Sequence, residues 1–219
     1  MAVCTFSFRV PPPLYRTNDA VFELPSVAGF NDVSARTTVV DGIRPISFNA
    51  VTEGNGSVRF PNDGLGLLHN TRFDVVLPVT MDEWRLNASR AGNTLALIAN
   101  QVLDWYRFYT DDALIRRIPL YSVRSYNVQD DFGRIGSSVL GWVPGEAAEN
   151  AGESDPAIVE SIQKALVRIG SIPIWKSLYL DAQAELLAGE LRSAVLLANA
   201  AMETLVNFAF RSIASEQEI

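Results

Sequence analysis

The stretch TMDEWRLNASRAGNTLALIANQVLDWYRFY, residues 80–109, decides the fold of this chain. Its large apolar residues recur at alternating steps of four and three, which places them along one side of an α-helix. They are Trp84, Ala88, Ala91, Leu95, Ile98, Val102, Trp105 and Tyr109. Thr80 and Glu83 have the spacing of a capping box, so we expect the helix to begin there. At ~1.5 Å per residue, one continuous helix over this stretch spans roughly 45 Å and can lie along a whole sheet.

Alternating apolar and polar residues on both sides of this helix predict the sheet that it covers. The alternation is clearest over residues 71–79, where every second residue is apolar. The sequence Gly54-Asn55-Gly56 between two short runs predicts a hairpin. We therefore expect an α+β fold with a largely antiparallel sheet packed on one long helix, followed by a C-terminal helical hairpin module. The other predicted strands are residues 5–10, 20–24, 37–40, 44–52, 58–60, 118–128 and 135–143.

A change of composition divides the chain into two parts. Residues 145–156 are mostly small or acidic and lack large apolar side chains, which is typical of a linker. Residues 1–144 before it are expected to form the α+β domain. Residues 157–219 after it are expected to be helical, and Gly189 separates the last two helices by a very short turn. The predicted helices are residues 156–169, 174–188 and 190–215.

The composition predicts a globular protein without a disulfide or a zinc site. The 219 residues are 48% hydrophobic, which suffices for a core, and the net charge is −7. Cys4 is the only cysteine and His69 the only histidine, too few for an intrachain disulfide or a four-ligand zinc site. Charged and amide residues interrupt the most apolar run, residues 191–210, and no basic leader precedes an apolar run near residue 1. We expect a soluble, cytoplasmic protein with no cofactor, no metal and no membrane contact.

No catalytic sequence motif is complete. A Gly-x-Ser-x-Gly elbow is missing, and neither lysine follows a glycine loop that could hold phosphates. His69 is interpreted as a loop residue between two strands, although a histidine also has the pKa of a general base. The pairs Asp111-Asp112 and Asp130-Asp131 suit either turns or a divalent cation. We favour turns for both pairs and expect no catalytic residue.

Aromatic and basic residues gather from the end of the long helix onward. Guanidinium groups and aromatic faces together can hold phosphates and stacked bases, which would make this cluster a site for RNA or another polyanion. A structural interpretation is favoured, because cations stabilise a helix C-terminus and aromatic rings anchor a helix on a sheet. The candidate binding residues are Arg107, Arg116, Arg117, Tyr121 and Arg124.

Three segments of the helical part carry a family resemblance: WKSL at residues 175–178, AGELRSAV at 188–195 and AAMETL at 200–205. This order of a helix, a Gly-acidic turn, Arg-x-Ala-Val and Ala-x-Glu-x-Leu resembles the helical core of prokaryotic HEPN-like (Apea-type) proteins. Residues 80–120 also resemble the N-terminal region of bacterial proteins that carry such a helical tail.

This resemblance implies a role in prokaryotic defence or stress response through protein or RNA interaction. Many members of the family are metal-independent ribonucleases with an arginine followed, four to six positions later, by a histidine. No histidine follows His69 here, and only Arg211 lies where that arginine is expected. The resemblance therefore implies a non-catalytic binding or regulatory protein. The alternative is a HEPN-type ribonuclease whose catalytic motif is absent from these residues.

The last predicted helix has a polar stripe and two apolar sides. Glu203 is expected to pair with an arginine of this helix or to face water, because a lone buried carboxylate is costly. One neighbouring helix cannot cover two apolar sides, and three helices do not close a four-helix bundle. We therefore expect a homodimer through the C-terminal helices, or packing of the last helix across the first domain. The polar residues are Arg192, Asn199, Glu203, Asn207 and Arg211.

Overall fold

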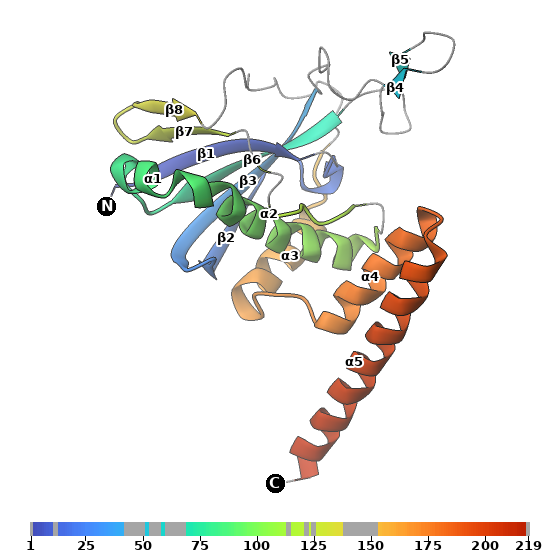
Figure 1. Cartoon of the computed structure of the whole chain (residues 1–219). Helices are drawn as coiled ribbons and strands as arrows, with labels where there is room; N and C mark the ends of the chain where they lie inside the picture. The colour runs from blue at the N-terminus through green and yellow to red at the C-terminus, as the bar shows by residue number, and fades with distance from the viewer. Residues whose placement is uncertain are drawn as a thin grey trace.

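A six-stranded antiparallel sheet in the order β2-β3-β6-β1-β7-β8 forms the centre of the molecule (Figure 1). The computed structural model describes residues 2–10, 13–41, 51–52, 58–59, 69–112, 115–120, 123, 126–137 and 153–217. The strands of the sheet are β1 Cys4–Val10, β2 Ala20–Val27, β3 Phe30–Asp41, β6 His69–Leu77, β7 Asn127–Asp130 and β8 Ile135–Ser137. A second sheet pairs β4 (Val51–Thr52) with β5 (Val58–Arg59), and a 3-10 turn, η1, spans Tyr15–Thr17.

One face of the sheet is apolar and carries the core. Along β1 every second residue is buried, so Phe6 and Phe8 point into the core and Ser7 points to the other face. β6 alternates in the same way and runs antiparallel beside β1, with Phe73 opposite Phe8. The rings of these two residues stack with their centroids 5.6 Å apart. The predicted α+β fold with an antiparallel sheet is confirmed.

Two consecutive helices, α1 (Met81–Leu86) and α2 (Ala88–Thr110), lie along the sheet (Figure 1). The predicted capping box is confirmed: the Thr80 hydroxyl accepts from the Glu83 N–H, and the Glu83 carboxylate accepts from the Thr80 N–H. The predicted continuity of the helix is wrong at Asn87, which has φ −116° and ψ 15°. Its side-chain amide donates to the Glu83 carbonyl at 3.1 Å, an interaction that competes with the helical backbone bonds.

Helix α3 (Pro156–Arg168) shares the core of the sheet. The Asp155 carboxylate accepts from the Ala157 N–H at 3.1 Å, as expected for a helix start before proline. Ile162 and Leu166 are buried in the cluster that contains the strands and α2. Most of the proposed linker lies outside the described residues, so the boundary at residues 145–156 stays a prediction. Because its buried residues lie in the core of the sheet, α3 belongs to the same packed unit as the sheet.

Helices α4 (Ile174–Leu187) and α5 (Leu191–Gln217) form the predicted hairpin. Gly189 between them has φ +82°, a conformation that glycine adopts without strain. α4 packs beside α2, whereas α5 extends away from the sheet (Figure 1). Among the described elements, α5 packs extensively only on α4, so it does not cross the first domain.

One predicted strand, residues 118–128, differs from the structure. Residues 118–120 are not a strand, because Asn100 of α2 binds the backbone of Ile118 through both ends of its amide: the Ile118 N–H donates to Oδ1 at 2.7 Å and Nδ2 donates to the Ile118 carbonyl at 2.8 Å. Strand β7 begins only at Asn127. The predicted strand 135–143 begins at Ile135 as β8 does, and residues 138–143 lie outside the described residues. The predicted hairpin at Gly54-Asn55-Gly56 and most of the strand over residues 44–52 lie outside the described residues.

Candidate functional site

Three of the predicted binding arginines lie together, each beside a carboxylate of the same chain. Arg107 of α2 donates to Asp181 of α4 at 2.7 Å. Arg117 donates from Nε to Asp104 of α2 at 2.7 Å and makes a second bond through Nη2. The hydrogen bond to Asp104 raises the pKa of the Arg117 guanidinium above its ordinary value, and burial lowers it less. This network joins α2, the segment after it and α4.

The arginines of the network differ in their access to solvent. The Arg107 side chain is 0% exposed, and its Nη1 lies 3.9 Å from Asp104. The Arg116 side chain is 55% exposed and lies 3.5 Å from Glu185, and that of Arg117 is 46% exposed. Arg107 therefore cannot reach a polyanion, whereas the other two keep one side in solvent. Tyr121 and Arg124 lie outside the described residues.

The aromatic residues at the end of α2 anchor the neighbouring helices. The Trp105 ring contacts those of Phe108 and Tyr109, and its Nε1 donates to the Gly170 carbonyl at 3.0 Å. Lys176 of α4 lies 5.7 Å from the Phe108 ring centroid. These contacts fix the turn between α3 and α4 against α2. They agree with the structural interpretation of the cluster. The aromatic faces on which bases would stack are already in contact with other side chains of the chain.

The five polar candidates of α5 are all exposed. Glu203 faces solvent, so it meets the expectation for a carboxylate without a buried partner. The stripe forms no inward network in the part of α5 whose side chains are described. The exposed residues are Arg192, Asn199, Glu203, Asn207 and Arg211.

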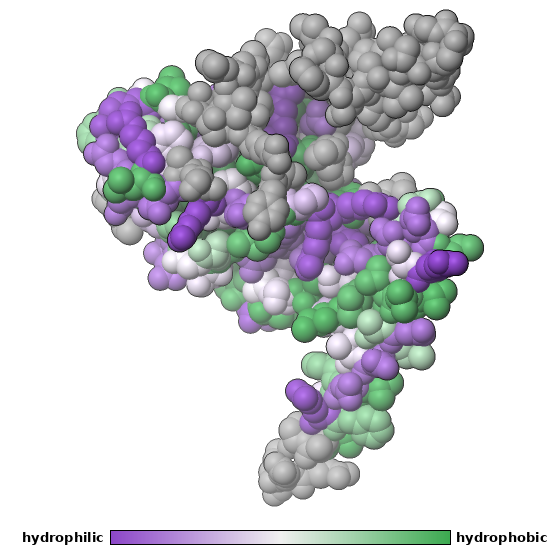
Figure 2. Space-filling model, in the orientation of Figure 1, coloured by the Kyte–Doolittle hydropathy of each residue, from purple (hydrophilic) through white to green (hydrophobic). Residues whose placement is uncertain are grey.

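A second stripe on α5 is apolar and equally exposed; we call it the α5 seam. It repeats at alternating steps of four and three, the spacing of coiled-coil core positions. Val195 is 59% exposed and Met202 62% exposed, although both occupy such positions. α5 turns Ala194 and Ala201 towards α4, and both are buried. The α5 seam consists of Leu191, Val195, Ala198, Met202, Leu205 and Ala209, and Figure 2 shows apolar residues exposed along α4 and α5.

The acidic pairs have turn and capping roles in the structure. Asp111 has φ +52° at the end of α2 and lies 3.0 Å from the Lys176 amine. The Asp130 carboxylate accepts from the Arg134 N–H at 2.8 Å and closes the β7–β8 turn. Within the described residues, no group of three or more His, Cys, Asp or Glu side chains could hold a metal ion. The backbone of His69 begins β6, and its side chain is outside the description.

Comparisons of the chain with protein-family models, curated proteins and solved structures gave no match. The resemblance to HEPN-like proteins therefore depends on the quoted segments alone. Function has to be inferred from the surfaces and cavities of this chain.

Proposed function

We propose that this protein is a non-catalytic binding protein that works as a homodimer, joined through the α4–α5 hairpins of two copies. The observation that carries the proposal is the α5 seam, which repeats at core spacing along a helix that, among the described elements, packs extensively only on α4. With 27 residues, α5 is about 40 Å long, so the seam offers an extended contact surface. A regulatory role in prokaryotic defence or stress response is the biological context that the HEPN resemblance suggests.

The residue types of the α5 seam support a second copy of the chain as its occupant. Leu191 and Leu205 fall at one core position of the repeat, and Val195 at the other, a combination that favours two-stranded pairing. Burying side chains of this size contributes about 1.5–3 kcal/mol each. Two α4–α5 hairpins facing each other complete a four-helix bundle, which one copy cannot form alone. A two-fold arrangement lets the same seam serve both partners.

A lipid bilayer is a less suitable occupant than a second copy. By length and composition alone, residues 191–213 could cross a membrane, and only 11% of the most apolar window is buried. Glu203 lies near the middle of this segment, and charged residues also occur near both ends, at Arg192 and Arg211. An acidic side chain at the bilayer centre costs roughly 2.5–3.5 kcal/mol. In a dimer the same polar stripe stays in water.

Light scattering after size exclusion tests the dimer. The expected mass is about twice the 24.0 kDa of one chain. Val195→Glu with Met202→Glu places charges in the seam and should give a monomer with unchanged helix content. Ser193→Glu with Asn207→Glu is the matched control, because it adds the same charge at exposed positions outside the seam and should leave the dimer intact.

Two results would contradict the proposal. One is a wild-type monomer at high micromolar concentration. The other is a dimer that survives both substitutions in the seam. Binding of the wild type to lipid vesicles, without a dimer in solution, would favour the membrane instead.

A further inference from the structure

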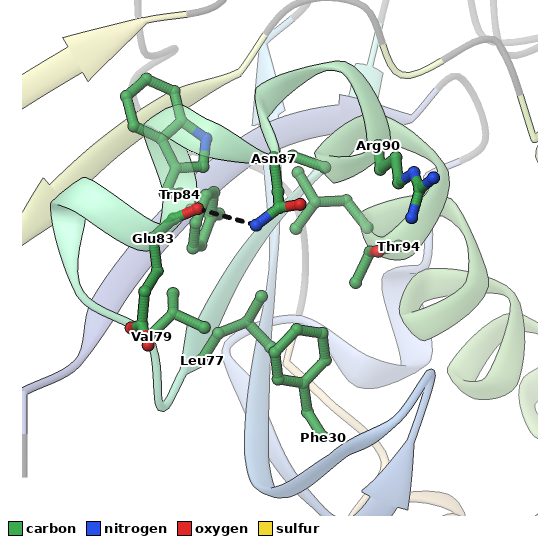
Figure 3. A pocket seen from close by; sticks show the side chains of 11 residues that line it. Phe30, Leu77, Val79, Glu83, Trp84, Asn87, Arg90 and Thr94 are labelled. Atoms are coloured by element: carbon green, nitrogen blue, oxygen red, sulfur yellow. Dashed lines mark hydrogen bonds between the residues drawn. The ribbon is translucent and has the colours of Figure 1, made fainter.

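An apolar pocket lies where α1 meets α2, above the ends of the central strands (Figure 3). Its volume is about 260 Å³. Its lining includes Phe6 of β1 and Leu77 of β6, which are both buried, and Trp84 of α1. At about 30 Å³ per water molecule, it has room for a compact molecule of roughly ten non-hydrogen atoms.

The break between the two helices opens this pocket. Asn87 lies in the break, and its Nδ2 is engaged with the Glu83 carbonyl (Figure 3). The Glu83 carboxylate points away from Arg90 in Figure 3, towards Val79. It accepts from the Thr80 N–H and hydroxyl, both at 2.8 Å. Hydrogen bonds from Thr80 lower the pKa of the Glu83 carboxyl, so this group stays ionised, and the capping box holds it on the side of Thr80.

The α2 side of the mouth carries hydrogen-bond donors. Arg90 and Thr94 lie one helical turn apart, and both line the pocket (Figure 3). Arg90 is exposed and makes no ion pair with the part of the chain that the structure describes. It differs in this from Arg107, Arg116 and Arg117, each of which has a carboxylate partner. A guanidinium that has no ion-pair partner among the described residues and lies beside an apolar pocket suits a ligand with one carboxylate.

We propose that this pocket binds a small amphipathic monocarboxylate. Its apolar body occupies the space between the sheet and α2, and its carboxylate accepts from the Arg90 guanidinium at the mouth. The Thr94 hydroxyl is the second donor. An uncharged molecule of the same shape lacks the charge-assisted bond and binds more weakly.

Calorimetric titration with octanoate and with 1-octanol tests this site. Octanoate should bind the wild-type protein more tightly than octanol. Arg90→Gln should weaken octanoate binding about tenfold or more and leave octanol unchanged, because it removes the charge and keeps much of the side-chain length. Ala91→Phe fills the pocket and should abolish binding of both. Arg85→Gln is the matched control, since this arginine is on α1, pairs with Asp82 and does not line the pocket.

A second measurement does not depend on the stability of any variant. The resonances of Trp84 should shift when octanoate is added to the wild-type protein, because this residue lines the pocket. Absence of octanoate binding at millimolar concentration would overturn the proposal. Equal octanoate affinity in the wild type and in Arg90→Gln would also overturn it, and so would binding that leaves the Trp84 resonances unmoved.

Discussion

Arg107 is the clearest single residue whose role changes between sequence and structure. The sequence places it in an aromatic and basic cluster that suits a polyanion, whereas the side chain is fully buried and donates to Asp181. The Asp181 side chain is 34% exposed, so removing Arg107 costs chiefly its charge-assisted hydrogen bond and not the burial of a lone charge. Arg107→Met should therefore lower the free energy of unfolding by about 1.5–3 kcal/mol, measured by denaturant titration. Arg116→Met is the control and should cost less than about 1 kcal/mol, because more than half of the Arg116 side chain is exposed to solvent.

Equal effects of the two substitutions would contradict the structural role of Arg107. The sequence alone does not separate these arginines, since burial depends on α4, which lies far along the chain. Helical periodicity does put Arg107 one turn from Asp104, but Asp181 becomes a neighbour only in the fold.

Asp130 makes the β7–β8 turn sensitive to acid. Burial by itself raises the pKa of its carboxyl, but the Arg134 guanidinium and N–H that donate to it hold the pKa below its ordinary value. The pKa of Asp130 is therefore lower in the folded protein than in the unfolded chain, where it is about 3.9. The stabilisation is complete above the unfolded pKa and is lost as the pH falls through the folded pKa. Thermal unfolding at pH 7 and pH 3 should show a smaller difference in Asp130→Asn than in the wild type. Asp82→Asn, at an exposed position, should keep the wild-type difference.

At the scale of elements, local signals predict the helices well and long-range pairing poorly. The structure confirms the helix ends predicted from capping residues, because capping depends only on neighbouring residues. These residues are Thr80 with Glu83, Asp155 with Pro156, and Gly189. The helix break at Asn87 could not be predicted from the hydrophobic periodicity, because the apolar steps of four and three continue across it. The pocket beside the break could not be predicted for the same reason.

Gly92 shows how closely α2 approaches a segment that sequence analysis treats as a strand. A Cβ at this position would lie 2.2 Å from the Val123 carbonyl oxygen, which is part of the backbone. Gly to Ala inside a helix normally stabilises it by about 1 kcal/mol. Here the clash should reverse the sign, and Gly92→Ala should destabilise the protein by about 1–3 kcal/mol in denaturant titrations. Leu97→Ala on the exposed side of α2 is the control, and its change in the free energy of unfolding should stay within about 0.5 kcal/mol. A stabilising effect of Gly92→Ala would show that the segment around Val123 is not packed this closely.

At the scale of the whole molecule, the surfaces available for RNA are limited. The net charge is −7, and the three arginines of the predicted site that the structure describes are paired with Asp104, Asp181 and Glu185. Only Arg116 and Arg117, among the predicted arginines whose position is described, keep about half of their side chains in solvent. RNA contact at this site therefore has to compete with carboxylates already in place, and binding of phosphates through few cations is weak and sensitive to salt.

We expect weak RNA binding without cleavage. A short labelled RNA should bind at low salt, lose most of its affinity at moderate salt, and bind less to Arg116→Ala with Arg117→Ala than to the wild type. Arg36→Ala with Arg85→Ala is the matched control, because it removes the same charge from exposed positions outside the cluster. The absence of binding at low salt, or equal binding by the two double variants, would remove RNA as a partner of this site.

The same RNA should stay intact, since His69 is the only histidine and lies far before Arg211 in the chain. Cleavage that persists on repurification and disappears in Arg211→Ala would instead support the ribonuclease alternative.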